Sequence, residues 1–298
     1  MTHALLLSPR IAPHPDRSPA TPEAIGRAAT LSLHDELALS PKPGLVTLVD
    51  RGSHTDMDAH TFMRSLLALR GYFVRIATLG AQGAAFPALQ ACGIEAEALM
   101  LAATGGINTH RGAIFMLGLL CAAAGAASAE GRVPHPSTVR LTLLERWGSE
   151  LRERAMRPST LPGGMAARRL GLRSAAAEAA AGFPVLFDTA LPALRAGLAR
   201  GLDGRGARLD ALFAVIAVLD DSNLAHRGGM EGLRYAQQAA RGFLADGGAA
   251  RTDGIAAAAA IGDAFVGRRL SPGGAADTLA AACLLHRLGT RDSPRGGR

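Results

Sequence analysis

The chain has 298 residues, 48% of them hydrophobic, and a formal net charge of +7. That length can bury a substantial core in one large or two smaller domains. Because aromatic residues make up only 4% and the arginines are dispersed, the charge does not indicate a nucleic-acid-binding protein. We expect most of the positive charge to lie on solvated arginine faces and the rest to bind an anionic small substrate.

The Ala- and Leu-rich segments of the chain have helical spacing, and alternating β-branched runs are almost absent. The sequence therefore predicts an all-α protein with one multi-helix globular domain over residues 22–288. Residues 1–21 and 289–298, rich in polar residues, Pro and Gly, are predicted to be disordered tails. Helices are expected over residues 22–39, 57–78, 93–103, 112–128, 136–155, 172–181, 186–200, 206–219, 229–246, 253–268 and 273–288. Residues 157–171 are predicted to form a long mobile loop.

Neither a signal peptide nor a membrane-spanning run is expected, because Arg, Gly or acidic residues interrupt every apolar stretch. The default is a soluble cytoplasmic protein without membrane contact. Cys92, Cys121 and Cys283 are widely spaced in apolar sequence, which favours reduced core thiols over a disulfide or a zinc site.

Three rare residues draw attention to three loops. Lys42 is the only lysine, and Asn108 and Asn223 are the only asparagines, in a chain dominated by Ala, Gly, Arg and Leu. Lysine is a compact point charge and arginine a planar fork, so a site that needs the first resists the second. All three lie in Gly- and His-bearing stretches, and we take these stretches as parts of one site.

The first two loops each lead into a helix. In "SPKPGLV", two prolines end the first helix, and "GSHTDMDAH" then supplies Thr55 or Asp56 as the next N-cap, with Asp58 in the first turn. In "TGGINTHRGAIF", a Gly-rich loop places His110 and Arg111 at the start of a long apolar helix. Exposed N–H groups and the helix dipole suit phosphate there, although ordinary capping of a turn explains the same residues.

The last two loops carry carboxylates. "DDSNLAHRGG" contains Asp220 and Asp221, which with Asn223 offer oxygen ligands for Mg²⁺, or else merely end a helix. "LSPGGAAD" places Asp277 in a first helical turn, where capping is the simpler explanation. No P-loop is present. The "LHDEL" segment, with His34 and Asp35, leaves a helical metal phosphohydrolase as an alternative.

Six patterns occur in order: "E-x4-PKPGLV", "G-x-H-x-DM", "TGGINTHRGAIF-x-LGLLCAA", "E-x3-GFP", "D-x-N-x3-RGG" and "SPGG-x-AD". Over about residues 25–285 the chain resembles the triphosphoribosyl-dephospho-coenzyme A synthase family, which serves citrate lyase and malonate decarboxylase. The resemblance implies that ATP and 3′-dephospho-coenzyme A are joined through a ribosyl-ribose link with release of adenine. The product would pass to a separate carrier-protein transferase.

The resemblance also implies roles for the matched residues. Inverting glycosyl transfer calls for carboxylates near the anomeric carbon, and Glu36, Asp56 and Glu178 are the candidates, with Glu36 or Asp56 as the base. Asp220 and Asp221 are assigned to Mg²⁺ on the triphosphate. The ATP and triphosphate contacts are assigned to Lys42, His54, Asn108, Thr109, His110, Arg111, Gly112, Asn223 and Arg227.

Two positions depart from the family pattern. Thr47 follows "PKPGLV" where Asp is expected, and Ala176-Ala177 precede Glu178 where Arg-Gly is expected, with Arg173 one turn earlier. "GSHTDMDAHTFM" favours the malonate decarboxylase branch. The competing hypotheses are a Mg²⁺-dependent ribosyl or phosphate hydrolase and a basic nucleic-acid-binding protein. The oligomeric state stays open, a homo-oligomer included.

Overall fold

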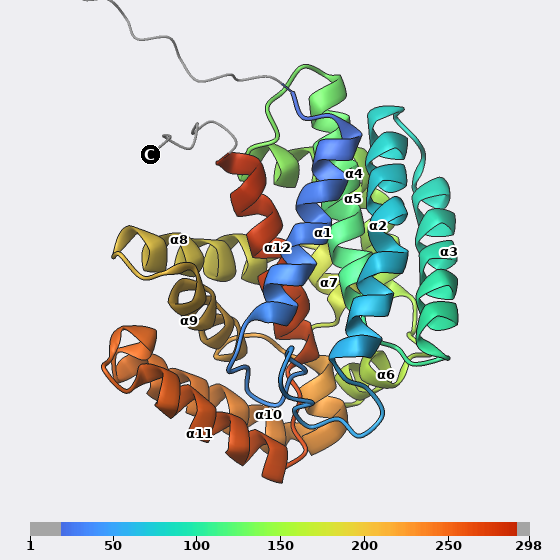
Figure 1. Cartoon of the computed structure of the whole chain (residues 1–298). Coiled ribbons are helices and arrows are strands. Elements are labelled where there is room, and N and C mark those ends of the chain that lie inside the picture. Colours follow the sequence, from blue (N-terminus) through green and yellow to red (C-terminus); the bar gives the residue numbers. More distant parts are fainter. Residues whose placement is uncertain (1–18, 291–298) are drawn as a thin grey trace, which may run out of the picture.

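The computed structural model describes residues 19–290, and this part of the chain contains helices but no strand. The helices form one domain, which confirms the predicted all-α class (Figure 1). The α-helices are α1 (Pro22–Ala38), α2 (Ala59–Ala81), α3 (Phe86–Thr104), α4 (Arg111–Ala129), α5 (Pro136–Met156), α6 (Pro162–Arg169), α7 (Ala175–Ala180), α8 (Leu191–Ala199), α9 (Gly204–Ile216), α10 (Ser222–Ala245), α11 (Gly254–Gly267) and α12 (Gly273–Gly289). A π-helical turn, Leu186–Ala190, precedes α8, and a 3₁₀ turn, Gly248–Ala250, precedes α11.

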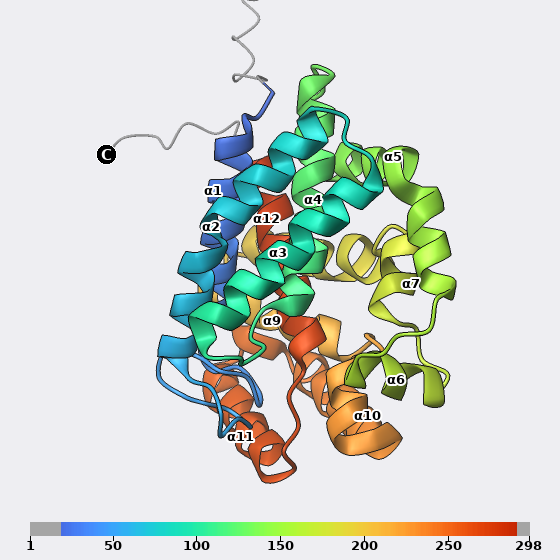
Figure 2. The ribbon, with the colours of Figure 1, turned by 90° about the vertical axis from the view of Figure 1, so that its right-hand side faces the viewer.

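Helices α1, α2, α4 and α12 form a central bundle (Figures 1 and 2). Small residues let α4 approach α2 closely. A Cβ on Gly80 would lie 2.0 Å from the carbonyl oxygen of Ala122, and one on Gly125 would lie 2.1 Å from that of Ala77. Because a substitution at either glycine meets rigid backbone, these glycines fix the position of α4 and of its N-terminus.

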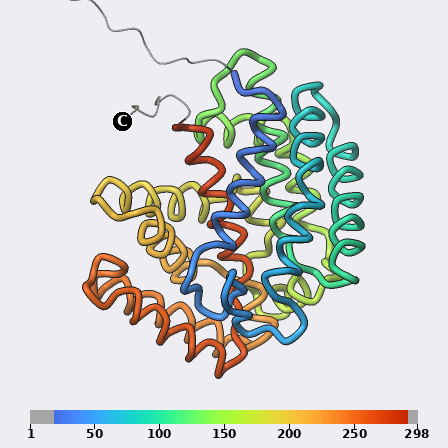
Figure 3. The backbone as a smooth tube through the Cα atoms, viewed as in Figure 1, coloured from blue at the N-terminus to red at the C-terminus, as the bar shows by residue number. Residues whose placement is uncertain are grey.

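The remaining helices surround this bundle. Helix α3 packs outside α2, α5 covers α4, and α7 covers α5. Helices α8 and α9 pack on each other and on α12, while α10 contacts α6, α9 and α11. The backbone trace shows α10 and α11 across one end of the bundle, next to the segment that follows α1 (Figure 3). This end is where the loops selected from the sequence emerge.

The structure has a helix at one place where the sequence predicted a loop. Residues 157–171, expected to be a mobile loop, contain α6, which packs against α10. Pro162 begins the helix, and Ala166 and Ala167 are buried. The Pro-Gly-Gly start hid the short helical run that follows it, because proline is tolerated in a first helical turn.

Three helix starts also differ from expectation. Helix α3 begins at Phe86 and α10 at Ser222, each seven residues earlier than predicted. Helix α10 contains a kink at Gly229, whose φ of 63° is left-handed, so the sequence period changes there. The N-cap of α2 is Asp58 rather than Thr55 or Asp56: its carboxylate accepts the backbone N–H of Thr61 at 3.0 Å.

The cysteines agree with expectation, but the described residues of the predicted tails do not, since α12 runs to Gly289. Most of the predicted tails, residues 1–18 and 291–298, lie outside the described residues. Residues 20 and 21 are ordered, however, since Ala20 is buried and Thr21 caps α1. All three cysteines are free and buried. Helix α4 is long and apolar enough to span a membrane, contrary to the expectation, but 72% of its apolar window is buried as a core helix.

Candidate active site

Four connecting segments meet at one end of the bundle. The C-terminal end of α1 and the N-terminal ends of α2, α4 and α12 lie there, with α10 and α11 beyond them (Figures 1 and 2). The segments comprise residues 39–58, 105–110, 217–221 and 268–272. Together with the helix ends, they carry the "PKPGLV", "NTHRGAIF", "DDSN" and "SPGG" patterns, so loops far apart in sequence form one site.

The only lysine forms a buried ion pair. Lys42 Nζ contacts Glu36 Oε1, and the two side chains are only 1% and 6% exposed. Burial lowers the pKa of Lys42, while the attraction of Glu36 opposes that shift. The pair forms because Pro41 and Pro43 end α1 and turn the chain back, which brings residue 42 beside the last turn of the helix.

His110 is buried at the N-terminus of α4. Its Nδ1 lies 2.6 Å from Ser65 Oγ of α2, and its ring meets Phe62 edge-on at 4.9 Å between centroids. The other ring nitrogen, Nε2, is buried without a hydrogen-bond partner. Burial and the nearby Lys42 lower the pKa of His110 to about 3. The imidazole is therefore neutral at ordinary pH and has one nitrogen available to a ligand.

Asp277, set aside as a capping residue in the sequence, lies against the start of α4. A Cβ on Gly112 would be 1.9 Å from Asp277 Oδ2, and the carboxylate accepts the backbone N–H of Ala113. Burial, Glu36 and Asp221 raise the pKa of Asp277 well above its usual range. The "SPGG-x-AD" pattern contained this residue, but only the fold shows that it faces the other carboxylates.

The two predicted metal ligands point to different partners. Asp221 Oδ1 accepts the backbone N–H groups of Asn223 at 2.8 Å and Leu224 at 3.3 Å, and Oδ2 accepts that of Ala275 at 3.0 Å. Asp221 thereby caps α10 and holds the start of α12. Burial nevertheless raises its pKa. Asp220 Oδ2 instead accepts the N–H of Arg173 at 3.0 Å.

Arg227 ties the segment after α1 to α10. Its guanidinium donates to the carbonyl oxygens of Ser53 at 3.0 Å and Arg269 at 3.3 Å, and to His54 Nδ1 at 3.2 Å. On the other edge of the His54 ring, Nε2 lies 2.9 Å from Ser271 Oγ. Burial and Arg227 lower the pKa of His54. Asp56, 3.7 Å from His54, is 59% exposed.

The other residues predicted to contact the triphosphate each have a different set of neighbours. Asn108 Oδ1 accepts the backbone N–H of Arg111 at 3.2 Å, so it caps α4, while Thr109 Oγ1 is buried without a partner. The Arg111 side chain turns away to α3, where Nε lies 2.8 Å from Glu97. Asn223 packs over α12: a Cβ on Gly273 would lie 2.6 Å from its Nδ2.

The third predicted carboxylate, Glu178, lies in a separate group of contacts. Glu178 accepts Arg173 Nη1 at 3.1 Å and the backbone N–H of Val185 at 3.4 Å. Arg173, the residue considered in place of the family arginine, therefore contacts Glu178 directly and links it to Asp220. Within the part of the chain that the structure describes, no hydrogen bond or ion pair joins Glu178 to the Lys42–Glu36 pair.

Two further sequence observations find structural explanations. Thr47, in place of the expected Asp, is buried, and its hydroxyl accepts the backbone N–H groups of Val49 at 3.2 Å and Asp50 at 2.9 Å. It closes the turn as an aspartate side chain could. Asp35 pairs with Arg208 and Arg287, and His34 is exposed. Asp35 therefore has a structural role in ion pairs and is not engaged as a metal ligand.

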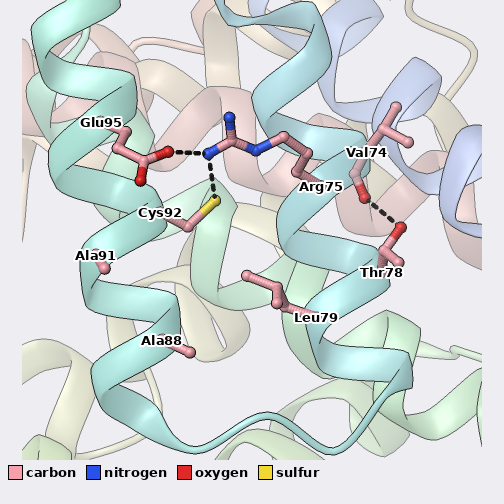
Figure 4. Close-up of a pocket in the computed structure, with 8 residues that line it drawn as sticks. All are labelled: Val74, Arg75, Thr78, Leu79, Ala88, Ala91, Cys92 and Glu95. Atoms are coloured by element: carbon pink, nitrogen blue, oxygen red, sulfur yellow. Dashed lines mark hydrogen bonds and ion pairs between the residues drawn. The ribbon is translucent and has the colours of Figure 1, made fainter.

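A hollow between α2 and α3 lies away from these residues. Its walls include Val74, Leu79 and Cys92, and Arg75 and Glu95 form an ion pair across it at 2.5 Å (Figure 4). None of its residues belongs to the patterns that meet at the end of the bundle. We therefore place the candidate site at the bundle end.

Comparison with known proteins identifies the family of the chain. A family model described as ATP:dephospho-CoA triphosphoribosyl transferase matches residues 22–295. A relative from Acinetobacter calcoaceticus is 37% identical over 84% of this chain and 86% of its own length. One from Azotobacter vinelandii is 40% identical over 91% and 93%, and one from Citrobacter koseri is 38% identical over 89% and 91%.

All three relatives are named probable 2-(5''-triphosphoribosyl)-3'-dephosphocoenzyme-A synthase. No solved structure matches the chain. The family match covers nearly all of the helical domain and every segment of the site. The chain belongs to the ATP:dephospho-CoA triphosphoribosyl transferase family.

Proposed function

We propose that this enzyme is a 2-(5''-triphosphoribosyl)-3'-dephospho-coenzyme A synthase. It transfers the triphosphoribosyl group of ATP to the 2'-hydroxyl of 3'-dephospho-coenzyme A and releases adenine. The family and the printed names of the relatives support this activity. The observation that carries it is the cluster of the buried Glu36, Lys42 and His110 with the partly buried Asp277, built from three matched patterns at one end of the bundle.

The cluster suits glycosyl transfer better than phosphoryl transfer. During the reaction the triphosphate is retained, and positive charge develops on the ribose as adenine leaves. Carboxylates such as Glu36 and Asp277 stabilise that charge, and Lys42 keeps Glu36 ionised and fixed. Lys42 is too deeply buried in its ion pair for a triphosphate to be its first partner, so we assign it this positioning role.

The triphosphate belongs at the rim of the site. The N-terminus of α4 presents Thr109 and His110, each with a buried polar atom that lacks a partner. His54 on the segment after α1 and Arg227 on α10 contact each other and supply further polar groups. Asn108 and Asn223 shape this rim through the helix starts that they support. Arg111 reaches the triphosphate only if it leaves Glu97.

The donor set does not fit a metal held by the protein itself. Among the described residues, no group of three or more His, Cys, Asp or Glu side chains could hold a metal ion. Asp221 already accepts backbone N–H groups on both oxygens, and Asp220 faces Arg173. We therefore propose Mg²⁺ only as the companion of the substrate triphosphate, where phosphate oxygens and water complete its shell.

The biological setting follows from the same proposal. The product is a prosthetic-group precursor, so a separate transferase must place it on a carrier protein. We favour malonate decarboxylase over citrate lyase as the destination because of the "GSHTDMDAHTFM" segment. We expect the enzyme in the cytoplasm, where ATP and dephospho-coenzyme A are made, and a homo-oligomer is compatible with its helical surface.

The deciding experiment measures free adenine by chromatography. Purified protein is incubated with ATP, Mg²⁺ and 3'-dephospho-coenzyme A, and each component is omitted in turn. Adenine that forms only with the acceptor, with a conjugate of the expected mass, supports the proposal. Adenine formed without the acceptor indicates a hydrolase. Absence of adenine rejects both and favours the binding-protein alternative.

A further inference from the structure

We propose that Asp277 is the general base, the group that takes the proton from the attacking hydroxyl of the acceptor. This inference rests on the proposed function and adds a residue that the sequence had assigned to helix capping. It also replaces Glu36 and Asp56 as candidates for the base. The base must be a carboxylate whose oxygen lone pairs are still free for a substrate.

The two other carboxylates close to Asp277 are engaged. Glu36 is bound by the ammonium group of Lys42. Asp221 accepts backbone N–H groups from Asn223, Leu224 and Ala275. Asp277 accepts only the N–H of Ala113, and no cation pairs with it among the described residues. It is the least neutralised carboxylate of the three.

The surroundings of Asp277 are shaped for it. Position 112 is a glycine, and any side chain there would occupy the place of the carboxylate, because a Cβ would lie 1.9 Å from Oδ2. Nearby, the buried His110 keeps Nε2 without a partner, which independently indicates a ligand at the start of α4. A carboxylate placed beside like charges is costly for stability, and carboxylates perturbed in this way cluster at functional sites.

Asp277 accepts the proton of the 2'-hydroxyl while that oxygen forms a bond to C1 of the ATP ribose. The bond between C1 and N9 of adenine breaks, and its electron pair leaves with adenine, which takes up a proton from water. Asp277 then returns its proton to the solvent. No oxidant, reductant or further reactant is needed.

The test uses the clash between Gly112 and Asp277. Asp277→Ala should lower kcat by about 10²–10⁴-fold, the usual contribution of a general base, while the Kd of ATP changes less than about threefold. Gly112→Ala should lower kcat as well, because its methyl group displaces the carboxylate. The double variant should be no worse than Asp277→Ala, because the methyl group then enters empty space. Gly71→Ala, where a Cβ meets nothing within 4 Å, is the matched control and should keep wild-type activity.

Formate supplies a second readout. It should raise kcat of Asp277→Ala at least about tenfold by restoring a small carboxylate base, and less in the double variant, whose methyl group fills part of that space. Asp277→Asn, which is isosteric, replaces Asp277→Ala if the latter fails to fold. A kcat of either variant within about threefold of wild type, or losses in Gly112→Ala and Asp277→Ala that multiply, would overturn the assignment alone. A wild-type protein that releases no adenine rejects the proposed function, and the assignment with it.

Discussion

Replacing Lys42 by methionine should destabilise the protein in a pH-dependent way. Methionine keeps most of the side-chain volume but leaves the Glu36 carboxylate buried beside Asp277 without its cation. A carboxyl group buried in this position loses its uncompensated charge by taking up a proton. Bringing a glutamic acid with an ordinary pKa of about 4.3 to its neutral form costs about 3.7 kcal/mol at pH 7 and about 1 kcal/mol at pH 5.

The value at pH 7 agrees with the roughly 3–5 kcal/mol lost when one partner of a buried ion pair is removed. We therefore expect Lys42→Met to lose about 3–4 kcal/mol of unfolding free energy at pH 7 and about 1 kcal/mol at pH 5. Lys42→Met combined with Glu36→Gln removes both charges and should recover most of the loss at pH 7.

Urea unfolding followed by circular dichroism measures these differences. Wild type, both single variants and the double variant form a thermodynamic cycle at each pH. A loss below about 1 kcal/mol for Lys42→Met at pH 7, or an equal loss at both pH values, would show that water reaches Glu36 and would refute the buried pair.

Three further predictions concern Asp277, His110 and Arg227. Because burial beside Glu36 and Asp221 raises the pKa of Asp277, the folded state holds that proton more tightly than the unfolded chain, and stability falls as pH rises through the raised pKa. Asp277→Asn should therefore raise Tm at pH 8 and have little effect near pH 4 in calorimetry; a gain that is largest in acid would contradict this sign. With a pKa of about 3, His110 should stay neutral, so its ring ¹⁵N shifts, assigned with His110→Gln, should not titrate between pH 5 and 8 in the native protein. Titration near pH 6.5, as in the urea-unfolded chain, would disprove its burial. Arg227→Gln should lose about 1–3 kcal/mol of stability and speed tryptic cleavage at the exposed Arg51, whereas Gln at the exposed Arg234 should do neither.

Helical periodicity was sufficient to predict the fold class but not all of the helix boundaries. Runs of Ala and Leu located the bundle helices because their spacing reports one buried face. The start of α10 was missed because Gly229 breaks the period, and α6 was missed because its eight residues follow Pro-Gly-Gly. Both errors occur where local backbone geometry, set by contacts distant in sequence, overrides composition.

The site was predictable as a set of loops and less so as a set of roles. Scarcity of Lys and Asn selected segments that the structure brings together. It could not show that Arg111 would turn to Glu97, that Asp221 would hold the start of α12, or that Glu178 would pair with Arg173. Such partnerships depend on side-chain directions between helices, which a single sequence does not contain.

The lone lysine is explained by burial more directly than by phosphate binding. An exposed triphosphate contact tolerates arginine, which forms bidentate pairs with phosphate and is favoured by this composition. The Lys42 ammonium is instead buried against Glu36, and a compact ammonium suits such a position better than a broad guanidinium. Lys42 neutralises Glu36, whereas Asp277 has no cation of its own among the described residues. The presence of this one lysine and the chemistry proposed for the site thus both depend on its buried ion pair with Glu36.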